Sequence, residues 1–228
     1  MRVITFRASV VFILALAAAA TIFAPYLHAQ PNGNSANTPG TEPNVSATDA
    51  VFPAMSSKYV RKDAPVNIPK FETAPVIDGV LNDGVWQTSA VFGDFLQTQP
   101  GDNVSPTHPT EFMMGYDSKN LYVAFKVTQD RDKVRATMSR RDNIFNDDYV
   151  LMYIDTFNDQ RQAYIIFFNP LGIQADGTYT EGRGEDFSVD LVMESKGVLT
   201  PDGFTIEAAI PFKSLRYEAG KNKQWGLN

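Results

Sequence analysis

Cysteine is absent from the 228-residue chain. Without a thiol, the chain cannot form a disulfide framework, a thiolate zinc site or a cysteine nucleophile. Histidine is nearly absent too, since only His28 and His108 occur. This scarcity excludes a histidine-rich metal cage and the His-Glu-x-x-His helix of metalloproteases.

Positive charge is also in short supply. Lys and Arg number 20 against 26 Asp and Glu, and the formal net charge is −6. A nucleic-acid binder needs a basic patch that displaces phosphate counterions, so this balance argues against nucleic acid as a partner. Hydrophobic residues make up 43% of the chain. That fraction suits a soluble globular protein and excludes a collagenous or fully disordered chain.

An apolar run over residues 10–23 follows two arginines at the N-terminus. A basic segment, a short apolar segment and a small residue such as Ala29 together form the pattern of a secretory signal peptide. The run is shorter than the roughly 20 residues that a membrane anchor needs, and Pro25 ends it. We therefore predict a signal peptide over residues 1–29 and an exported bacterial protein, which is periplasmic, outer-membrane-associated or extracellular.

The segment over residues 30–66 is rich in Pro, Gly, Asn, Ser and Thr and has almost no periodic apolar residues. Such a segment cannot bury enough surface to offset its ordering entropy, so we predict a flexible linker. The remaining body, residues 67–228, is long enough for one domain with a substantial core.

Short apolar runs in the body are separated by turn signals about every 8–12 residues, which is typical of a β protein. Residues 120–128 alternate apolar and polar side chains, which predicts a half-buried strand paired with residues 110–116. Residues 164–168 are apolar on both faces, which predicts a central strand covered on both sides. Further strands are expected at residues 91–98, 148–155, 173–180, 189–194 and 204–210, and from residue 225 onward.

Helical patterns are scarce, with short pieces expected only near residues 82–90 and 132–138. Sequential hairpins with so little helix predict an all-β fold, an antiparallel β-sandwich of immunoglobulin-like or jelly-roll-like type with one or two short helices. In the strand phases assigned here, four side chains point into the core. They are Phe125, Ile154, Ile166 and Ile206.

Four motifs follow one another along the body. They are Ala74–Gly79 with Leu81–Asp83 and Trp86; Asn120–Val123 leading to Asp130; Asp147–Asp155 with Phe168–Gly172; and Asp202–Phe204 with Glu207–Phe212 and Trp225–Asn228. In this order and spacing the chain resembles the family 9 carbohydrate-binding modules, above all those at the N-terminus of large exported bacterial proteins. The resemblance implies a β-sandwich, recognition of sugar chain ends, structural calcium in some members, and linkage to polysaccharide-degrading enzymes.

The resemblance also indicates where a sugar would bind. Phe145 stands where sugar-binding members carry a clamp aromatic, just before an acidic pair. Those members have a sugar-facing carboxylate and arginine where this chain has Leu151 and Ile165. Their second clamp aromatic follows the segment that matches Trp225–Asn228, so we expect the sandwich to lack its last strands.

Sugar binding requires a flat aromatic face beneath the pyranose C–H groups and planar polar side chains that reach the hydroxyls. The residues expected at the site are Phe145, Tyr149, Tyr153 and Phe187 as aromatic contacts, with Arg141 and Asn146 as hydrogen-bonding groups. For Arg141, the alternative is an ion-paired turn with Asp142. Trp86 is expected in the core and not at the sugar site.

Calcium is the one cofactor expected. Hard cations take carboxylate oxygens, and the candidate ligands are Asp147, Asp148, Asp155 and Asp159. The alternative, which we favour from the residues alone, is that they form a solvated acidic loop.

The favoured function is carbohydrate binding by a non-catalytic module of an exported protein that takes part in xylan- or cellulose-type polysaccharide catabolism. The alternative is an interaction or structural domain of an outer-membrane or periplasmic assembly, which the apolar Leu151 and Ile165 favour. Part of a glycoside hydrolase acting on O-glycosyl bonds ranks lower, because no spacing singles out two carboxylates as an acid/base pair. A Ser-His-Asp triad is disfavoured because His108 lies alone in a proline-flanked loop.

Overall fold

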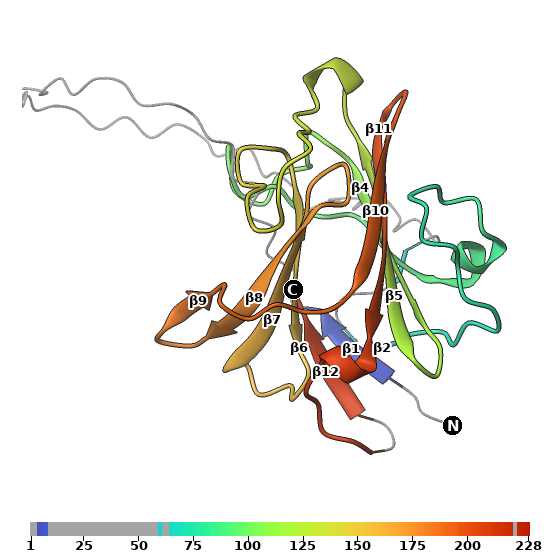
Figure 1. The fold of residues 1–228 in the computed structure, drawn as a ribbon, viewed down its shortest axis with the longest axis vertical. Coiled ribbons are helices and arrows are strands. Elements are labelled where there is room, and N and C mark those ends of the chain that lie inside the picture. Colours follow the sequence, from blue (N-terminus) through green and yellow to red (C-terminus); the bar gives the residue numbers. More distant parts are fainter. Residues whose placement is uncertain (1–3, 9–58, 61–63, 221–222) are drawn as a thin grey trace, which may run out of the picture. The chain divides into compact units, whose positions relative to one another are not determined.

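The computed structural model describes residues 4–8, 59–60, 64–220 and 223–228. Most of the predicted signal peptide and linker lies outside these residues. The described residues form two β-sheets that face each other across a shared hydrophobic core (Figure 1). The predicted all-β sandwich is therefore confirmed.

The larger sheet has seven strands in the order β2-β1-β12-β6-β7-β8-β9. Its strands are β1 (Ile4–Ala8), β2 (Val66–Asn67), β6 (Val150–Asp155), β7 (Gln162–Phe168), β8 (Gln174–Thr180), β9 (Gly184–Asp186) and β12 (Lys223–Leu227). Neighbouring strands run antiparallel except β1 and β12, which pair in parallel. As predicted, β7 lies inside the sheet with buried residues on both of its faces.

The smaller sheet has five strands in the order β10-β11-β5-β4-β3. Its strands are β3 (Ala90–Phe92), β4 (Thr110–Tyr116), β5 (Asn120–Thr128), β10 (Glu194–Thr200) and β11 (Gly203–Pro211). The predicted β4–β5 hairpin is confirmed residue for residue. Its turn is fixed by Asp117, whose Oδ1 accepts hydrogen bonds from the backbone N–H groups of Lys119 and Asn120 at 2.6 and 2.7 Å.

Three short 3₁₀ turns are the only helical elements among the described residues. They are η1 (Gly84–Thr88), η2 (Arg131–Lys133) and η3 (Phe212–Ser214). At η1 the hydroxyls of Thr88 and Ser89 donate to the carbonyl oxygens of Val85 and Trp86. Because these hydroxyls occupy carbonyls that a longer helix would use, η1 ends after one turn.

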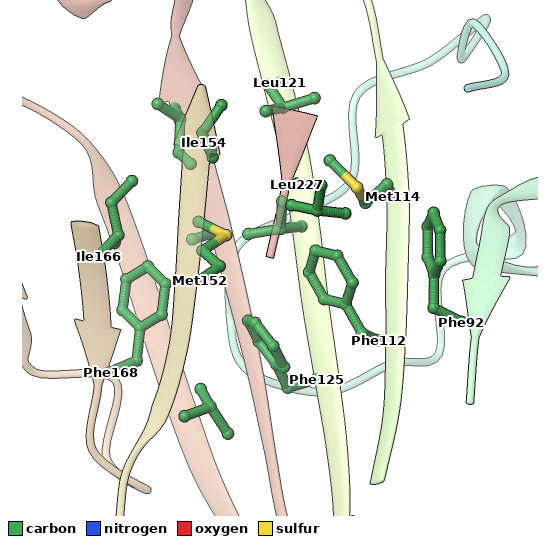
Figure 2. Packing of buried hydrophobic residues seen from close by; sticks show 14 of the residues in the cluster. Phe92, Phe112, Met114, Leu121, Phe125, Met152, Ile154, Ile166, Phe168 and Leu227 are labelled. Atoms are coloured by element: carbon green, nitrogen blue, oxygen red, sulfur yellow. The ribbon is translucent and has the colours of Figure 1, made fainter. Parts of the chain in front are cut away.

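The core lies between the two sheets. Phe125, Ile154, Ile166 and Ile206 are each 0% exposed, so the predicted strand phases are confirmed. Figure 2 shows side chains of the two sheets meeting in this layer, with Phe112 and Phe125 on one side and Met152 and Phe168 on the other. The Phe112 and Phe125 rings stack with centroids 4.6 Å apart.

A buried carboxylate fastens the segment before β3 to the outer face of the smaller sheet. Glu207 on β11 is fully buried and accepts hydrogen bonds from the indole N–H of Trp86 at 2.6 Å and from the backbone N–H groups of Asp78 and Gly79. Burial raises the pKa of the Glu207 carboxyl, and the three N–H donors act in the opposite direction. Trp86 is therefore a core residue, as predicted, held by both packing and a hydrogen bond.

Replacing Glu207 with glutamine is expected to lower the free energy of unfolding by about 1–3 kcal/mol. Glutamine has one acceptor oxygen, so its amide NH₂ must face at least one of the three N–H donors. Urea unfolding of the variant measures the loss. Glu72→Gln is the matched control because Glu72 is exposed, and equal stability of Glu207→Gln and wild type would show that the carboxylate is not what fastens this segment.

The first strand of the C-terminal hairpin is displaced from its predicted position. A strand was expected at residues 189–194, but the structure places β10 at Glu194–Thr200, and residues 187–193 form a connecting segment. The backbone of Leu191 in this segment does not join a ladder. Its N–H donates to Asp176 Oδ2 at 2.5 Å, and its carbonyl accepts from Arg141 at 2.8 Å. Two side chains thus take the backbone groups that a strand would need.

The N-terminal strand β1 falls inside the segment predicted to be a signal peptide. It pairs with β12 from Ile4↔Lys223 to Ala8↔Leu227 and with β2 through Thr5 and Phe6. Within the described part of the chain, no helix is long and apolar enough to cross a membrane.

Candidate carbohydrate-binding site on the outer aromatic face

Aromatic side chains gather on the outer face of the seven-stranded sheet, which is turned away from the smaller sheet. Strand alternation puts Met152 and Ile154 in the core and Tyr153 on the outside. We call one group of four residues the outer aromatic patch; its members are Phe145, Tyr149, Phe167 and Phe187. The ring of Phe145 lies 5.3 Å from Phe167, 5.7 Å from Phe187 and 6.1 Å from Tyr149, measured between centroids.

The patch has a buried floor and an exposed rim. Phe167 on β7 is 5% exposed and lies beneath the other rings, whereas Phe145 and Phe187 are 44% and 36% exposed. Most of their contacts are edge-to-face, so the exposed rings are braced by neighbours and not loose on the surface. Two braced aromatic faces open to solvent form a surface that can stack against a ligand.

Hydroxyl and carboxylate groups continue the site along β6. Tyr153 donates a hydrogen bond from its hydroxyl to Glu185 Oε1 on β9 at 3.1 Å, and its ring contacts Tyr179 on β8. Burial, together with the Glu185 carboxylate, raises the pKa of Tyr153 to about 12 and also raises the pKa of Tyr149. Both phenols therefore remain protonated donors at neutral pH. Tyr149 directly precedes β6, and the four residue steps from it to Tyr153 span roughly 13 Å.

The loop that carries Phe145 is held by hydrogen bonds of two buried polar side chains, Asp147 and Asn169. Asp147 is buried and accepts hydrogen bonds from the Thr137 backbone N–H at 3.0 Å and from the Asn169 side-chain amide at 2.9 Å. Asn169 Oδ1 in turn accepts from the backbone N–H groups of Leu171 and Ile173. Ile144, the residue before Phe145 on the same loop, is fully buried and anchors the loop by packing in the apolar cluster with Ile165 and Phe167. Phe145 is thus presented on a fixed loop.

Phe187 reaches the patch because the chain after β9 crosses closely over β8. The crossing occurs at Gly177, where a Cβ atom would lie 2.3 Å from the carbonyl oxygen of Asp186. Only glycine leaves room for that approach. The crossing brings the Phe187 ring to 6.0 Å from Phe167.

Arg141 is engaged in ion pairs away from the outer aromatic patch, because its partner Asp176 is in register with the core residue Ile166 and so points to the inner face of β8. Its guanidinium pairs with the fully buried Asp176 and with the Leu191 carbonyl, and it lies 3.9 Å from Asp142. The Arg141 side chain is 35% exposed. Burial raises the pKa of Asp176, whereas the Leu191 N–H and the Arg141 charge act to lower it. The ion-paired arrangement weighed from the sequence is present, and its main partner, Asp176, comes from β8.

The model of the carbohydrate family 9 binding domain-like family matches residues 77–228, about two thirds of the chain. The chain belongs to this family. Carbohydrate family 9 modules bind without catalysing a reaction, which agrees with the prediction that this segment is not itself an enzyme.

Solved structures of carbohydrate binding modules of family 9 are similar in fold. Two come from Caldicellulosiruptor kristjanssonii, one in complex with cellotriose and one in complex with glucose. They are 19% and 18% identical to this chain, and each alignment has a TM-score of 0.50 and covers 70% of this chain and 73% of the other. A search of the curated proteins finds no match.

The family resemblance assigned a carboxylate and an arginine to the positions of Leu151 and Ile165. The structure places both residues on the outer face, where Leu151 pairs in register with Phe167 and Ile165 with Tyr153. Ile165 is fully buried and Leu151 is half-buried. Between the two ends of the face, this family 9 domain therefore has apolar side chains where sugar-binding members carry polar ones, and of the two only Leu151 reaches the surface.

The four acidic residues proposed for calcium do not fit one site. Asp147 and Asp148 precede β6, whereas Asp155 is its last residue and Asp159 follows it, so the two pairs lie roughly 20 Å of strand apart. In the part of the chain that the structure describes, no group of three or more acidic or histidine side chains is placed to hold a metal ion.

Their oxygens instead accept hydrogen bonds from the protein itself. Asp148 binds the Arg135 guanidinium through both Nε and Nη2, and Asp155 accepts from the backbone N–H groups of Phe157, Asn158 and Gln160. Asp159 closes a turn by accepting from the Arg161 N–H. Calcium binding by this family 9 domain stays a prediction without an assigned ligand set.

The sequence-predicted aromatic residues fall into two groups. Phe145, Tyr149 and Phe187 meet in the outer aromatic patch, and Tyr153 lies farther along with Tyr179. Asn146 is exposed next to Phe145. Sequence reasoning missed Phe167 and Glu185. The outward phase of the central strand could have identified Phe167, but no pattern marked the short strand β9 that carries Glu185.

Proposed function

We propose that this family 9 domain binds poly- or oligosaccharide on the outer aromatic patch and the adjoining Tyr153–Glu185 pair. The observation that carries the proposal is the pair of exposed rings, Phe145 and Phe187, braced over buried Phe167. The exposed faces match the apolar C–H face of a pyranose. Tyr153, Glu185 and Asn146 supply donors and acceptors for sugar hydroxyls.

Binding on this face is expected to be weak. Stacking of one pyranose on an aromatic ring contributes about 1 kcal/mol. Leu151 and Ile165 offer no polar atom between the two ends of the face, so few hydrogen bonds add to the stacking. We expect millimolar dissociation constants, on the order of −4 kcal/mol of binding free energy.

We further propose a cellulose- or xylan-type polysaccharide as the ligand, and a role in anchoring an exported protein during polysaccharide catabolism. The two similar family 9 modules were solved with cellotriose and with glucose, which supports a β-glucan ligand. Association with O-glycosyl hydrolase activity would then lie in a partner or in another domain.

Retention on insoluble polysaccharide tests this function. The wild-type chain is expected to be retarded on columns of cellulose or xylan, and a Phe145→Ala/Phe187→Ala double variant is expected to elute earlier. A Phe157→Ala variant serves as a matched control, because Phe157 is 51% exposed and lies outside the patch. Equal retention of all three chains would place sugar binding elsewhere.

An interaction module is the second candidate function. Half-buried Leu151 continues the outer aromatic patch, and an aromatic and aliphatic surface of this kind also fits a protein partner in an outer-membrane or periplasmic assembly. Absence of binding to every glycan tested, with an intact fold, would favour this candidate.

We also propose that the chain is exported and that residues 1–29 are removed. The basic segment followed by an apolar run supports this. Mass spectrometry of the exported protein is expected to show an N-terminus at Gln30. An exported chain that still begins with residues 1–7 would contradict the prediction.

A further inference from the structure

Strand β1 lies in the larger sheet between two strands that are distant from it in sequence. It lies between β12, with which it pairs over five residues in parallel, and the two-residue strand β2. Residues 4–8 are far in sequence from both neighbours. β12 and β2 are therefore brought into one sheet only through β1.

A groove of about 620 Å³ lies beside this position. It borders both neighbours of β1, since its lining includes Asn67 of β2 together with Lys223 and Trp225 of β12. Three more aromatic residues line it, namely Tyr116, Phe212 and Tyr217. Phe212, Tyr217 and Trp225 contact one another, with Tyr217 and Trp225 centroids 5.5 Å apart.

The sequence of β1 suits such a position. Ile4, Phe6 and Ala8 are apolar, and they alternate with Thr5 and Arg7. This is the period-two pattern of a half-buried strand. A sheet edge beside an apolar groove is the combination by which proteins take up an extended segment, because the edge supplies backbone hydrogen bonds and the groove accepts alternate side chains.

We propose that the space between β2 and β12 is a strand-acceptor site, which the precursor fills with its own residues Ile4–Ala8. Folding of the precursor then sequesters part of the segment that targets it for export, and cleavage after export removes one strand from the sheet. This inference rests on the proposed export of the chain. It couples folding to export, because a folded precursor hides its targeting segment and cleavage removes the strand that pairs with both β2 and β12.

Hydrogen exchange of the full-length wild-type chain is the first test. The amide hydrogens of β1 are expected to be protected together with those of β12, because both belong to one ladder. Amides of residues 4–8 that exchange at the rate of a free peptide would overturn the proposal. This measurement needs no variant and does not depend on how a substitution folds.

A proline variant tests the same contact energetically. Thr5 pairs with Gln224 on one side and Asn67 on the other, so proline at this position removes a ladder hydrogen bond wherever the N–H points. Thr5→Pro in the full chain is expected to lower the melting temperature by roughly 5–10 °C. Thr5→Ala, which keeps the N–H, is expected to change it far less. Equal melting of Thr5→Pro and wild type would overturn the proposal.

Rescue in trans tests the acceptor site itself. A synthetic peptide of residues 2–10 is expected to raise the melting temperature of the Thr5→Pro chain in proportion to the logarithm of its concentration. The same peptide carrying proline at position 5 is the control. No effect of the wild-type peptide would overturn the acceptor site. These experiments use neither sugar nor an export assay, so their failure leaves carbohydrate binding and signal cleavage to be judged separately.

Discussion

Replacing Arg141 with alanine is expected to lower the free energy of unfolding by about 3 kcal/mol. The variant leaves the fully buried Asp176 carboxylate without its cation and leaves the Leu191 carbonyl without a side-chain donor. These contacts hold β8 to the segment before β10, so their loss loosens the connection between the sheets. Denaturant unfolding monitored by tryptophan fluorescence measures the change.

The loss is expected to depend on pH. Burial already raises the pKa of Asp176 above its value in the unfolded chain, and removing the Arg141 charge raises it further. The folded variant then binds a proton that the unfolded chain releases, so its stability falls as pH rises above about 4. The difference between variant and wild type should be largest at neutral pH and shrink toward pH 4, roughly the unfolded pKa of aspartate.

Arg140→Ala is the matched control, because Arg140 is exposed on the same loop. It is expected to change stability by less than about 0.5 kcal/mol. If Arg141→Ala is as stable as Arg140→Ala yet loses sugar affinity, Arg141 is a ligand-binding side chain and not a structural one.

Truncating Ile166 to alanine is expected to cost about 2–5 kcal/mol of the free energy of unfolding. Ile166 is fully buried in the middle of β7, with Met152 beside it on β6 and Asp176 on β8 in register. Its strand is covered on both faces, as Figure 2 shows for the inner one, so the surroundings cannot collapse far into the space left behind.

Val192→Ala provides the comparison for this truncation. Val192 is 70% exposed, so the loss of its methyl groups should change stability by less than about 0.5 kcal/mol. A cost for Ile166→Ala as small as that of the control would mean that the strand phase of β7 is wrong.

Much of the fold could be predicted from the sequence because local pattern and tertiary packing agree. The β4–β5 hairpin has an alternating strand and an aspartate-fixed turn, and β7 is apolar on both faces, so periodicity alone gave their positions. The strand expected at residues 189–194 was wrong because Arg141 and Asp176, distant in sequence, capture the Leu191 backbone. No local sequence pattern predicts a long-range contact of that kind.

The candidate site was predictable to a similar extent. The resemblance located Phe145, the need for aromatic contacts to a sugar added Tyr149 and Phe187, and the structure brings these three together. It could not show that Arg141 is held by a buried carboxylate, because that partner lies 35 residues away on another strand. The strand expected at residues 148–155 already places Asp148 and Asp155 at opposite ends, and β6 confirms that separation.

Calorimetry with cellotriose tests the central claim, that this family 9 domain binds sugar on the outer aromatic patch. Wild type is expected to bind with a millimolar dissociation constant, and Phe145→Ala about five-fold more weakly, since one stacking contact of about 1 kcal/mol is lost. Phe157→Ala, which removes an exposed ring outside the patch, is expected to bind like wild type. Binding that is tight and unchanged in Phe145→Ala, or no binding by the folded wild-type chain, would contradict the account.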